Sequence, residues 1–494
     1  MFQHTAKTGR KGNTFLFIPE LFLAQNNFCK NTCLTLNTNM RYLIAIISMG
    51  IFMLSACKKD IQFTEDHLDF SADTVLFDTV FTTIGSTTKK LKVYNYNKQP
   101  INIDEVELMG GESSPFRLNF DGVPGDYFEN IEIPAEDSLF MFVEVTLEVN
   151  NATNPLVISD SIRFKTNGLN QYVNLDVWGQ DAYFHVDELV SGTWANDKPH
   201  VLYNVVACGY PGLDSNQNLT IPAGTQVYCH KNSILVVYKS SIDIQGTLDN
   251  EVVFQGDRLE SFYDDVSGQW WGIRLIESNY STIDYAVIKN GSVGLQVDST
   301  QAPQTLLLTN TIIDNHDFFG LNVNAGANIT MENCILGDAG IASSYLFAGG
   351  EYHFTHNSIV NYWSGSRAGP GLLIKNYFEV DNVVYCREIV NSEFTNNVVY
   401  GGIDKEFEVD TLPCSIDMTF NTNYFKRDEA YTYTSYDGTL WSGDPLFVDA
   451  FAKDYHLQSN SPLIDQGIFT GVLKDIKDVT RTIPPDIGAI EYQP

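Results

Sequence analysis

A repeat of about two dozen residues is the feature that most narrows what this chain can fold into. Pairs of apolar residues followed by a polar corner recur at Val287-Ile288-Lys289-Asn290, Ile312-Ile313-Asp314-Asn315, Ile335-Leu336-Gly337-Asp338 and Ile359-Val360-Asn361. Their starts lie 25, 23 and 24 residues apart, and Gly294-Leu295 returns 26 residues later as Gly320-Leu321. Short strands at this period, without helical periodicity, predict a β-solenoid in which each coil stacks its apolar pair on the coil below. A propeller blade, at roughly 40 residues, is too long for this spacing.

Two details of the repeat carry further expectations. The next apolar pair, Val398-Val399, comes 39 residues after Ile359, which predicts an insertion or an irregular coil. Asparagine and aspartate stand at the corners of the repeats, where stacked side-chain amides can hydrogen-bond from coil to coil. We therefore interpret the asparagines as structural ladders.

Three motifs in the same part of the chain resemble right-handed parallel β-helix proteins of the Bacteroidetes type. They are Leu219 to Tyr228, Phe254-Gln255-Gly256-Asp257-Arg258 and Gln269-Trp270-Trp271-Gly272-Ile273. The resemblance covers about 300 residues. It implies a β-helix surface that recognises carbohydrate or another macromolecule, on a fold that elsewhere also hosts polysaccharide lyases and hydrolases.

An earlier segment, from about Leu68 to Trp178, alternates apolar and polar residues with period two between turn signals, as in Lys90-Leu91-Lys92-Val93-Tyr94. Seven or so short strands at this spacing predict a β-sandwich of immunoglobulin type. The segment resembles the abnormal-spindle/hydin-type immunoglobulin-like modules of exported bacterial proteins. The likeness is carried by Leu91 to Asn95, Ile131 to Ala135, Ile162 to Gly168 and Val173 to Gly179. It implies a spacer or adhesive platform.

The apolar stretch from Tyr42 to Met53 is too short for a comfortable membrane-spanning helix, which needs about 20 residues. It follows Met40-Arg41 and ends in Leu54-Ser55-Ala56-Cys57, the pattern of a secretory signal with small residues before the cut. This segment resembles the lipobox of bacterial lipoproteins, which implies lipidation of Cys57 and an outer-membrane lipoprotein in the cell envelope. Residues 1–39 would then be a mis-annotated leader.

These observations predict a domain plan for the all-β chain. A signal peptide (40–56) is followed by a tether (57–67), an immunoglobulin-like sandwich (68–185), a right-handed parallel β-helix (186–443) and a C-terminal segment (444–494). The C-terminal segment resembles that of other β-helix envelope proteins. It is expected to cap the solenoid, whose end would otherwise expose unpaired strand edges.

Composition limits partners and cofactors. A formal charge of −31 repels phosphate backbones, so nucleic-acid binding is not expected. The five cysteines after Cys57 form no CxxC pair, and their odd number leaves at least one free thiol. A disulfide between Cys208 and Cys229 is one open alternative. No phosphate-binding loop, metal-ligand spacing or nucleophile elbow is present, so we expect no metal, no cofactor and a monomeric protein.

Catalytic candidates are weak. Asp264 and Asp265, near Arg258, are the best cluster of carboxylates, but neighbours on an extended chain point to opposite sides. A lyase would need a basic residue, and those available lie outside any motif that we can match: Arg258, Arg274, Lys289, Arg367, Lys375 and Arg387. His353 and His356 also face opposite ways on a strand and make a poor metal pair, and His316 is interpreted as a corner residue.

Exposed aromatic residues would favour sugar binding. The contact candidates are Trp270, Trp271 and Trp363, with the aromatic run from Tyr424 to Tyr436, although aromatic side chains also fill cores. We therefore expect a non-catalytic, lipid-anchored envelope protein that recognises a glycan or another macromolecule. A polysaccharide lyase or glycoside hydrolase and a purely structural envelope protein are the alternatives.

Overall fold

A computed structural model describes residues 63–494, except 65, 83–84, 149–155, 214, 299–304, 325, 368, 428–434 and 442. Cys57, the signal segment 40–56 and the leader 1–39 lie outside the described residues. The described residues form β-strands and short 3-10 turns: η1 (Gly111–Ser113), η2 (Ser261–Tyr263) and η3 (Ala450–Ala452). None of these elements is a helix with the length and apolar character needed to cross a membrane. The prediction of an all-β fold is confirmed.

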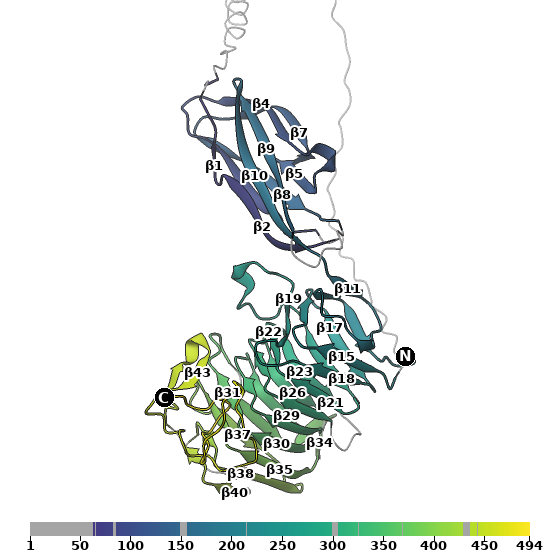
Figure 1. The fold of residues 1–494 in the computed structure, drawn as a ribbon, viewed down its shortest axis with the longest axis vertical. Coiled ribbons are helices and arrows are strands. Elements are labelled where there is room, and N and C mark those ends of the chain that lie inside the picture. Colours follow the sequence, from purple (N-terminus) through teal and green to yellow (C-terminus); the bar gives the residue numbers. More distant parts are fainter. Residues whose placement is uncertain are drawn as a thin grey trace, which may run out of the picture. The chain divides into compact units, whose positions relative to one another are not determined.

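The N-terminal part of the described chain is a β-sandwich (Figure 1). In spatial order, its first sheet contains β1 (Asp69–Phe70), β3 (Lys89–Asn95), β8 (Asp137–Val145), β5 (Phe116–Phe120) and β6 (Val123–Gly125). The second contains β2 (Thr74–Phe81), β10 (Leu169–Gln180), β9 (Leu156–Thr166), β4 (Ile101–Leu108) and β7 (Tyr127–Ile133). All pairs are antiparallel except β2 with β10. The period-two pattern has the expected cause: in β3, Leu91 and Val93 are fully buried while Lys90 is exposed.

The following residues coil into a parallel β-helix, whose described strands form sheets of eleven, ten and eight (Figure 1). The eleven-stranded sheet contains β11 (Tyr183–Val186), β13 (His200–Tyr203), β16 (Gln226–Cys229), β19 (Val252–Gly256), β22 (Ala286–Lys289), β25 (Ile312–Asp314), β28 (Ile335–Leu336), β31 (Ser358–Asn361), β36 (Val398–Gly401), β39 (Tyr424–Phe425) and β41 (Leu440–Trp441). The ten-stranded sheet contains β12 (Gly192–Thr193), β15 (Asn218–Pro222), β18 (Ser241–Gln245), β21 (Ser281–Asp284), β24 (Leu306–Thr309), β27 (Asn328–Glu332), β30 (Glu351–Thr355), β35 (Ile389–Thr395), β38 (Ile416–Asn421) and β40 (Ser435–Asp437). The eight-stranded sheet contains β14 (Val205–Cys208), β17 (Ile234–Tyr238), β20 (Gly272–Ile276), β23 (Val293–Asp298), β26 (Phe319–Asn324), β29 (Ala342–Phe347), β32 (Leu372–Lys375) and β37 (Phe407–Asp410). The predicted β-helix is confirmed.

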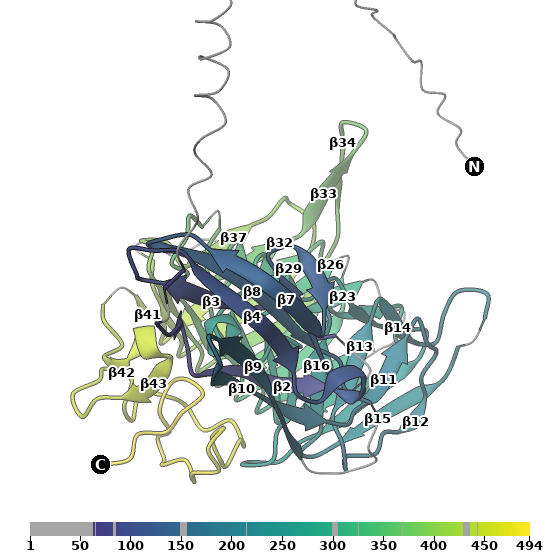
Figure 2. The same cartoon turned by 90° about the horizontal axis from the view of Figure 1, so that it is seen from above.

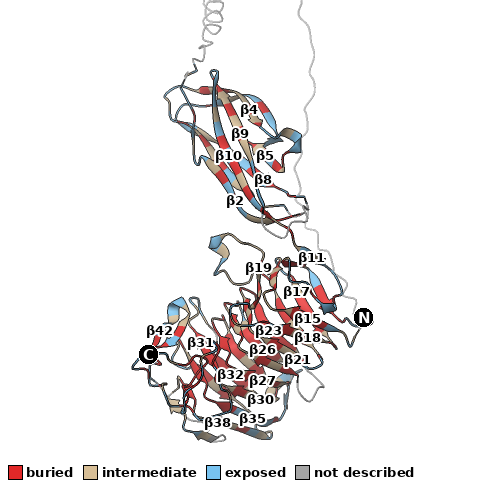
Figure 3. Cartoon of the chain, in the orientation of Figure 1, coloured by how far each residue is buried: buried red, intermediate tan, exposed pale blue. Residues whose placement is uncertain are grey.

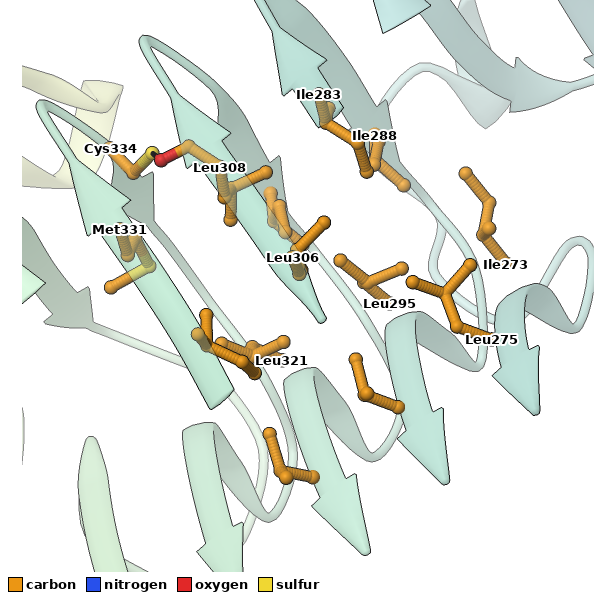
Figure 4. Close-up of a cluster of buried hydrophobic side chains, with 14 of the residues drawn as sticks. Ile273, Leu275, Ile283, Ile288, Leu295, Leu306, Leu308, Leu321, Met331 and Cys334 are labelled. Carbon is orange, nitrogen blue, oxygen red and sulfur yellow. Dashed lines mark hydrogen bonds between the residues drawn. The ribbon is translucent and has the colours of Figure 1, made fainter. Parts of the chain in front are cut away.

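The core of the β-helix consists of columns of apolar residues contributed by successive coils (Figures 3 and 4). Ile273 pairs with Leu295, and Leu295 with Leu321, so the predicted Gly-Leu repeat does stack. All three side chains are fully buried. Because each coil covers the apolar column of the next, no coil has a complete core by itself, which is the physical reason that such a repeat is needed.

One predicted alignment is out of register. The sequence places Ile335 against Ile359, but the structure pairs Ile335 with Ser358 and Leu336 with Ile359. Leu336 and Ile359 face the interior, whereas Ile335 and Val360 lie in a second apolar cluster on the outer side of the sheet. Because both faces of these strands are covered, an apolar residue can lie either in the interior of the β-helix or on its outer side. The apolar pattern therefore allows the predicted alignment of the two strands to be wrong by one residue.

The predicted ladder at the repeat corners is confirmed for Asn290 and Asn315. A longer ladder runs through Asn357, Asn397 and Asn423, which stand directly before β31, β36 and β39. Asn357 Nδ2 donates to Asn397 Oδ1 at 2.9 Å, and Asn397 Nδ2 donates to Asn423 Oδ1 at 3.0 Å. The backbone N–H of Asn357 also donates to Asn397 Oδ1, at 3.0 Å. The corner pair joins Asn315 Nδ2 to Asn290 Oδ1 at 2.8 Å. These amides satisfy the corner backbone groups that a buried turn would leave without partners.

The long interval before Val398 is an insertion, as predicted, and it carries a hairpin. Strands β33 (Tyr377–Val380) and β34 (Val383–Cys386) pair antiparallel and project from the β-helix (Figure 2). A disulfide joins Cys386 to Cys414. The alternative pair, Cys208 and Cys229, is wrong: these buried residues lie on different sheets, β14 and β16, and both belong to the apolar core.

The C-terminal segment, which includes β42 (Phe447–Asp449) and β43 (Asp454–Leu457), packs along the side of the β-helix. Its apolar residues, among them Leu463 and Ile487, cluster with the outward-facing Ile335, Val360 and Val398 of the eleven-stranded sheet. These contacts are with the outer side of the sheet and do not test whether the segment also covers the solenoid end, so capping stays a prediction. Aromatic rings fill the last two described coils: Phe407, Phe420 and Phe425 in one, and Tyr436 and Trp441 in the next.

Candidate functional site

The carboxylates suggested by the sequence do not converge on one point. Asp265 lies in the loop after η2 with 86% of its side chain exposed, and its Oδ1 is 3.6 Å from Lys453 Nζ. Asp264 is also exposed. Arg258 forms an ion pair with Glu260: the Nε and NH2 atoms of Arg258 each lie 3.1 Å from a carboxylate oxygen of Glu260. This loop therefore presents separated charges, with no acid and base sharing a cleft.

The three candidate tryptophans have different environments. Trp270 is only 1% exposed, and its ring stacks with that of Phe254 at a centroid distance of 6.3 Å. Its Nε1–H donates to the Lys289 carbonyl oxygen at 2.9 Å. Its assignment as a carbohydrate contact is wrong, because the indole belongs to the core. Trp271 and Trp363 are half-buried, and their assignment as carbohydrate contacts stays a prediction.

The three histidines considered in the sequence have different environments. His316 is fully buried; its Nδ1 accepts from the Gly291 N–H, and burial lowers its pKa to about 4. His356 is buried, whereas His353 Nε2 lies 3.0 Å from Glu351 Oε1 on the outer side of the strand. The expectation that His353 and His356 face opposite ways agrees with these positions. Among the described residues, no group of three or more histidine, cysteine or acidic side chains is placed to hold a metal ion.

The outer faces of the three sheets differ in what they offer a ligand. The eleven-stranded sheet is partly covered by the C-terminal segment. We call a set of residues that pair across successive strands of one sheet a row. One row of the ten-stranded sheet consists mainly of threonine and acidic residues: Thr220, Asp243, Thr282, Leu307, Thr330, His353, Glu393 and Thr419. The eight-stranded sheet instead combines aromatic rings, amides and paired charges.

We call two outward-facing rows of the eight-stranded sheet the open face. The first row is Val236, Arg274, Gln296, Asn322, Tyr345, Leu373 and Glu408. The second is Tyr238, Ile276, Asp298, Asn324, Phe347, Lys375 and Asp410. These residues face outward because their strand neighbours, such as Leu346 between Tyr345 and Phe347, lie in the core.

Aromatic rings run continuously from the open face onto the hairpin. The Tyr345 ring centroid is 5.6 Å from that of Phe319 and 5.3 Å from that of Phe347. Phe378, on β33, lies 6.5 Å from Phe347 and stacks on Tyr385 of β34 at 5.5 Å. The hairpin thus extends the aromatic surface away from the sheet.

The hairpin is firmly attached at its base and apolar at its tip. Besides the disulfide, Asn376 Nδ2 donates to the Leu412 carbonyl oxygen at 3.0 Å, and its Oδ1 accepts from the Leu412 N–H at 2.8 Å. Val380 and Val383, at the tip, are each 50% exposed. An isolated two-stranded hairpin is at best marginally stable in water, so these attachments preserve an exposed apolar surface.

The charges of the open face are internally paired. Arg274 Nε is 2.5 Å from Asp298 Oδ2, and Asp298 Oδ1 accepts from Gln296 Nε2 at 2.8 Å and Asn324 Nδ2 at 3.0 Å. Lys375 Nζ lies 3.4 Å from Asp410 Oδ2. No positive charge in the two rows is left over for an anionic ligand.

The same charges do not form a convincing catalytic centre. Burial opposes the charged form of Lys375, but contacts with Tyr377 and Asp410 outweigh it and raise the Lys375 pKa, whereas a general base needs a lowered one. Asp298 and Asp410 are four strand spacings apart, roughly 19 Å. Glu408 and Asp410, two residues apart on β37 and so about 7 Å from each other, are the closest carboxylate pair in the rows. Glu408 is bound by Lys405 at 2.8 Å.

Sequence reasoning identified part of this site. Among six basic residues it named Arg274 and Lys375, and it named Trp271, whose ring lies 5.9 Å from the Arg274 guanidinium group. It missed Tyr345 and Phe347. The alternation of Tyr345 and Phe347 around Leu346 is the signal that marks an aromatic outer face.

Comparison with known proteins does not assign this chain to a family. No family model and no curated protein matches the sequence. A family 123 glycoside hydrolase from Clostridium perfringens, solved to explain glycolipid glycan hydrolysis, matches with 9% identity and a TM-score of 0.18, over 24% of this chain and 30% of that chain. The ASH/PapD-like domain of human CEP192 matches with 9% identity and a TM-score of 0.17, over 26% of this chain and 94% of that domain. TM-scores this low carry no argument about the role of this chain.

Proposed function

We propose that this protein binds a glycan along the open face of its β-helix, without cleaving it. The observation that carries the proposal is the aromatic path through Tyr345 and Phe347, with the half-buried side chains of Asn324 and Lys375 beside Phe347 on the adjoining strands. Binding sites for small ligands combine apolar and aromatic surface with a few fixed polar groups. Sugar rings present the same combination, with apolar C–H faces and hydroxyl groups at their edges.

Loss of the aromatic pair tests this proposal. The double substitution Tyr345→Ala, Phe347→Ala is expected to weaken glycan binding about 10- to 30-fold, because each ring contact contributes on the order of 1 kcal/mol. The full chain, purified in detergent, would be screened on an array of neutral and acidic oligosaccharides. Affinity for the best glycan would then be measured by calorimetry.

Phe262→Ala is the matched control, since this ring is 78% exposed in the η2 loop, off the open face. It should leave the affinity unchanged. Equal losses in the control and the double variant, or no binding to any array member, would refute the proposal.

A glycoside hydrolase is the second candidate function, and Glu408 and Asp410 are the pair that supports it. They lie two residues apart on one face of β37, so their backbones are roughly 7 Å apart, a spacing that would allow the carboxyl separation of an inverting enzyme. Release of new reducing ends from any array glycan, abolished by Asp410→Asn, would establish this alternative and overturn the non-catalytic proposal.

We further propose that the protein is a lipid-anchored component of the bacterial envelope. The lipobox-like Leu54-Ser55-Ala56-Cys57 supports the anchor, and the Cys386–Cys414 disulfide supports an oxidising compartment outside the cytoplasm. The full chain is expected to partition into the detergent phase of a Triton X-114 separation, and Cys57→Ser into the aqueous phase. Identical partitioning of the two proteins would contradict the anchor.

A further inference from the structure

The outer face of the first sandwich sheet carries lysine and aromatic side chains in adjoining strands. Residues of β3 pair with those of β8 in an antiparallel register. Alternate residues face outward, because those between them, such as Leu91 and Val143, are fully buried. We call the outward-facing set the lysine–aromatic face: Lys90, Lys92 and Tyr94 of β3 with Phe140 and Phe142 of β8.

Two ammonium groups of this face lie against one aromatic ring. Lys90 Nζ is 4.3 Å and Lys92 Nζ is 4.9 Å from the centroid of the Phe140 ring. Among the cation–π contacts of the described residues, Phe140 is the only ring with two cations. Like charges held this close repel each other, and a bound anion would offset that repulsion.

The protein itself does not supply that anion. Neither lysine forms an ion pair with a carboxylate among the described residues. Glu144, the next outward-facing residue of β8, accepts from Thr88 Oγ1 at 2.6 Å instead. Asp69 stands at the other end of the face, where it pairs with Tyr94.

The second sandwich sheet provides an internal comparison. On its outer face, Arg163 NH2 lies 3.0 Å from Glu105 Oε2 and also contacts Glu107, and Lys165 Nζ lies 2.7 Å from Glu105 Oε1. The same module therefore neutralises its cations on one face and leaves two of them without carboxylates on the other. In a chain of formal charge −31, the lysine–aromatic face is a local site of opposite sign.

Exposed rings beside the lysines indicate what kind of anion would fit. Phe142 is 38% exposed, and Tyr96, which stacks on Tyr94 at 5.1 Å, is 67% exposed. Each unit of a uronic acid polymer combines a carboxylate with an apolar C–H face, so it matches both features. A single polysaccharide chain can contact this face alone, whereas an anionic bilayer would also face the negative charge of the whole protein.

We propose that the lysine–aromatic face binds an acidic, uronate-containing polysaccharide, with Lys90 and Lys92 contacting its carboxylates and the exposed rings contacting its sugar faces. This site is separate from the open face and goes beyond the proposed function. It also gives the immunoglobulin-like sandwich a binding role of its own.

The test measures binding of hexagalacturonate and hexaguluronate to the full chain by calorimetry. At least one of them is expected to bind, more weakly as sodium chloride is raised. The double substitution Lys90→Gln, Lys92→Gln should weaken that binding about 5- to 10-fold, because two ion pairs are lost. Lys90→Arg, Lys92→Arg keeps both charges and should retain most of the affinity.

The matched control is Lys231→Gln, Lys477→Gln, which makes the same change in net charge at two exposed lysines outside the sandwich. It should bind the uronates like the wild type. An equal loss in the control, or no binding of either uronate, would overturn the inference.

Two further outcomes separate this site from its alternatives. If Tyr345→Ala, Phe347→Ala abolishes uronate binding and the lysine substitutions do not, the inference is wrong and the open face is the site. If the wild type prefers phosphatidylglycerol to phosphatidylcholine vesicles, and the Lys→Gln variant loses this preference without any uronate binding, the face recognises lipid and the inference is again wrong. Uronate binding lost only in the Lys→Gln variant supports the inference, even if no glycan binds the open face.

Discussion

Replacing Asn397 by alanine is expected to lower the free energy of unfolding of the β-helix by about 3 kcal/mol. Asn397 is 1% exposed and links three coils. Its Oδ1 accepts from the backbone N–H and Nδ2 of Asn357, and its Nδ2 donates to the Phe354 carbonyl oxygen and Asn423 Oδ1. Truncation leaves the Asn357 N–H buried without its acceptor and also creates a cavity. Both effects lower the free energy of unfolding.

Urea denaturation followed by tryptophan fluorescence measures this loss. Asn421→Ala is the control, since its side chain lies at the surface and substitution there should change the free energy by less than about 0.5 kcal/mol. Asn397 does not have a positive φ, so the substitution tests the side chain and not the backbone conformation. Equal midpoints for the two variants would contradict a structural ladder.

The coils of the β-helix were predictable because their apolar pairs obey a simple physical rule. Ile288, Ile313 and Leu336 each cover the next coil, and the spacing of such residues can be read directly from the sequence. Prediction of the register failed where Ile335 and Val360 face a second apolar layer, because the sequence does not reveal that distant residues cover them.

The candidate site was harder to predict because residue type alone does not give exposure. Tryptophan was the natural choice for a sugar contact, yet Trp270 fills the core while Tyr345 and Phe347 form the outer surface. The Cys386–Cys414 disulfide likewise joins an inserted hairpin to a later coil, a proximity created only by folding.

Exchange of Arg481 for leucine is expected to destabilise the docked C-terminal segment by about 3–5 kcal/mol. The guanidinium group is almost fully buried; it lies 3.2 Å from Glu491 Oε2 and donates to Asn333 Oδ1 at 2.8 Å and to the Gly488 carbonyl oxygen at 3.0 Å. Asn333 belongs to the β-helix, so Arg481 links the segment to the coils. Without Arg481, the Glu491 carboxylate would be buried without its cation, which is the costly case for a buried ion pair.

Loss of this docking has a visible consequence, because the segment covers Ile335, Val360 and Val398. Arg481→Leu should therefore melt at a lower temperature and bind more of a hydrophobic fluorescent dye before the main transition. Lys474→Met is the matched control in the same segment: its ion pair with Asp478 is more than half exposed, and such pairs contribute at most about 1 kcal/mol. If Arg481→Leu melts like this control and binds no additional dye, the C-terminal segment is held by its apolar contacts alone and the buried ion pair is dispensable.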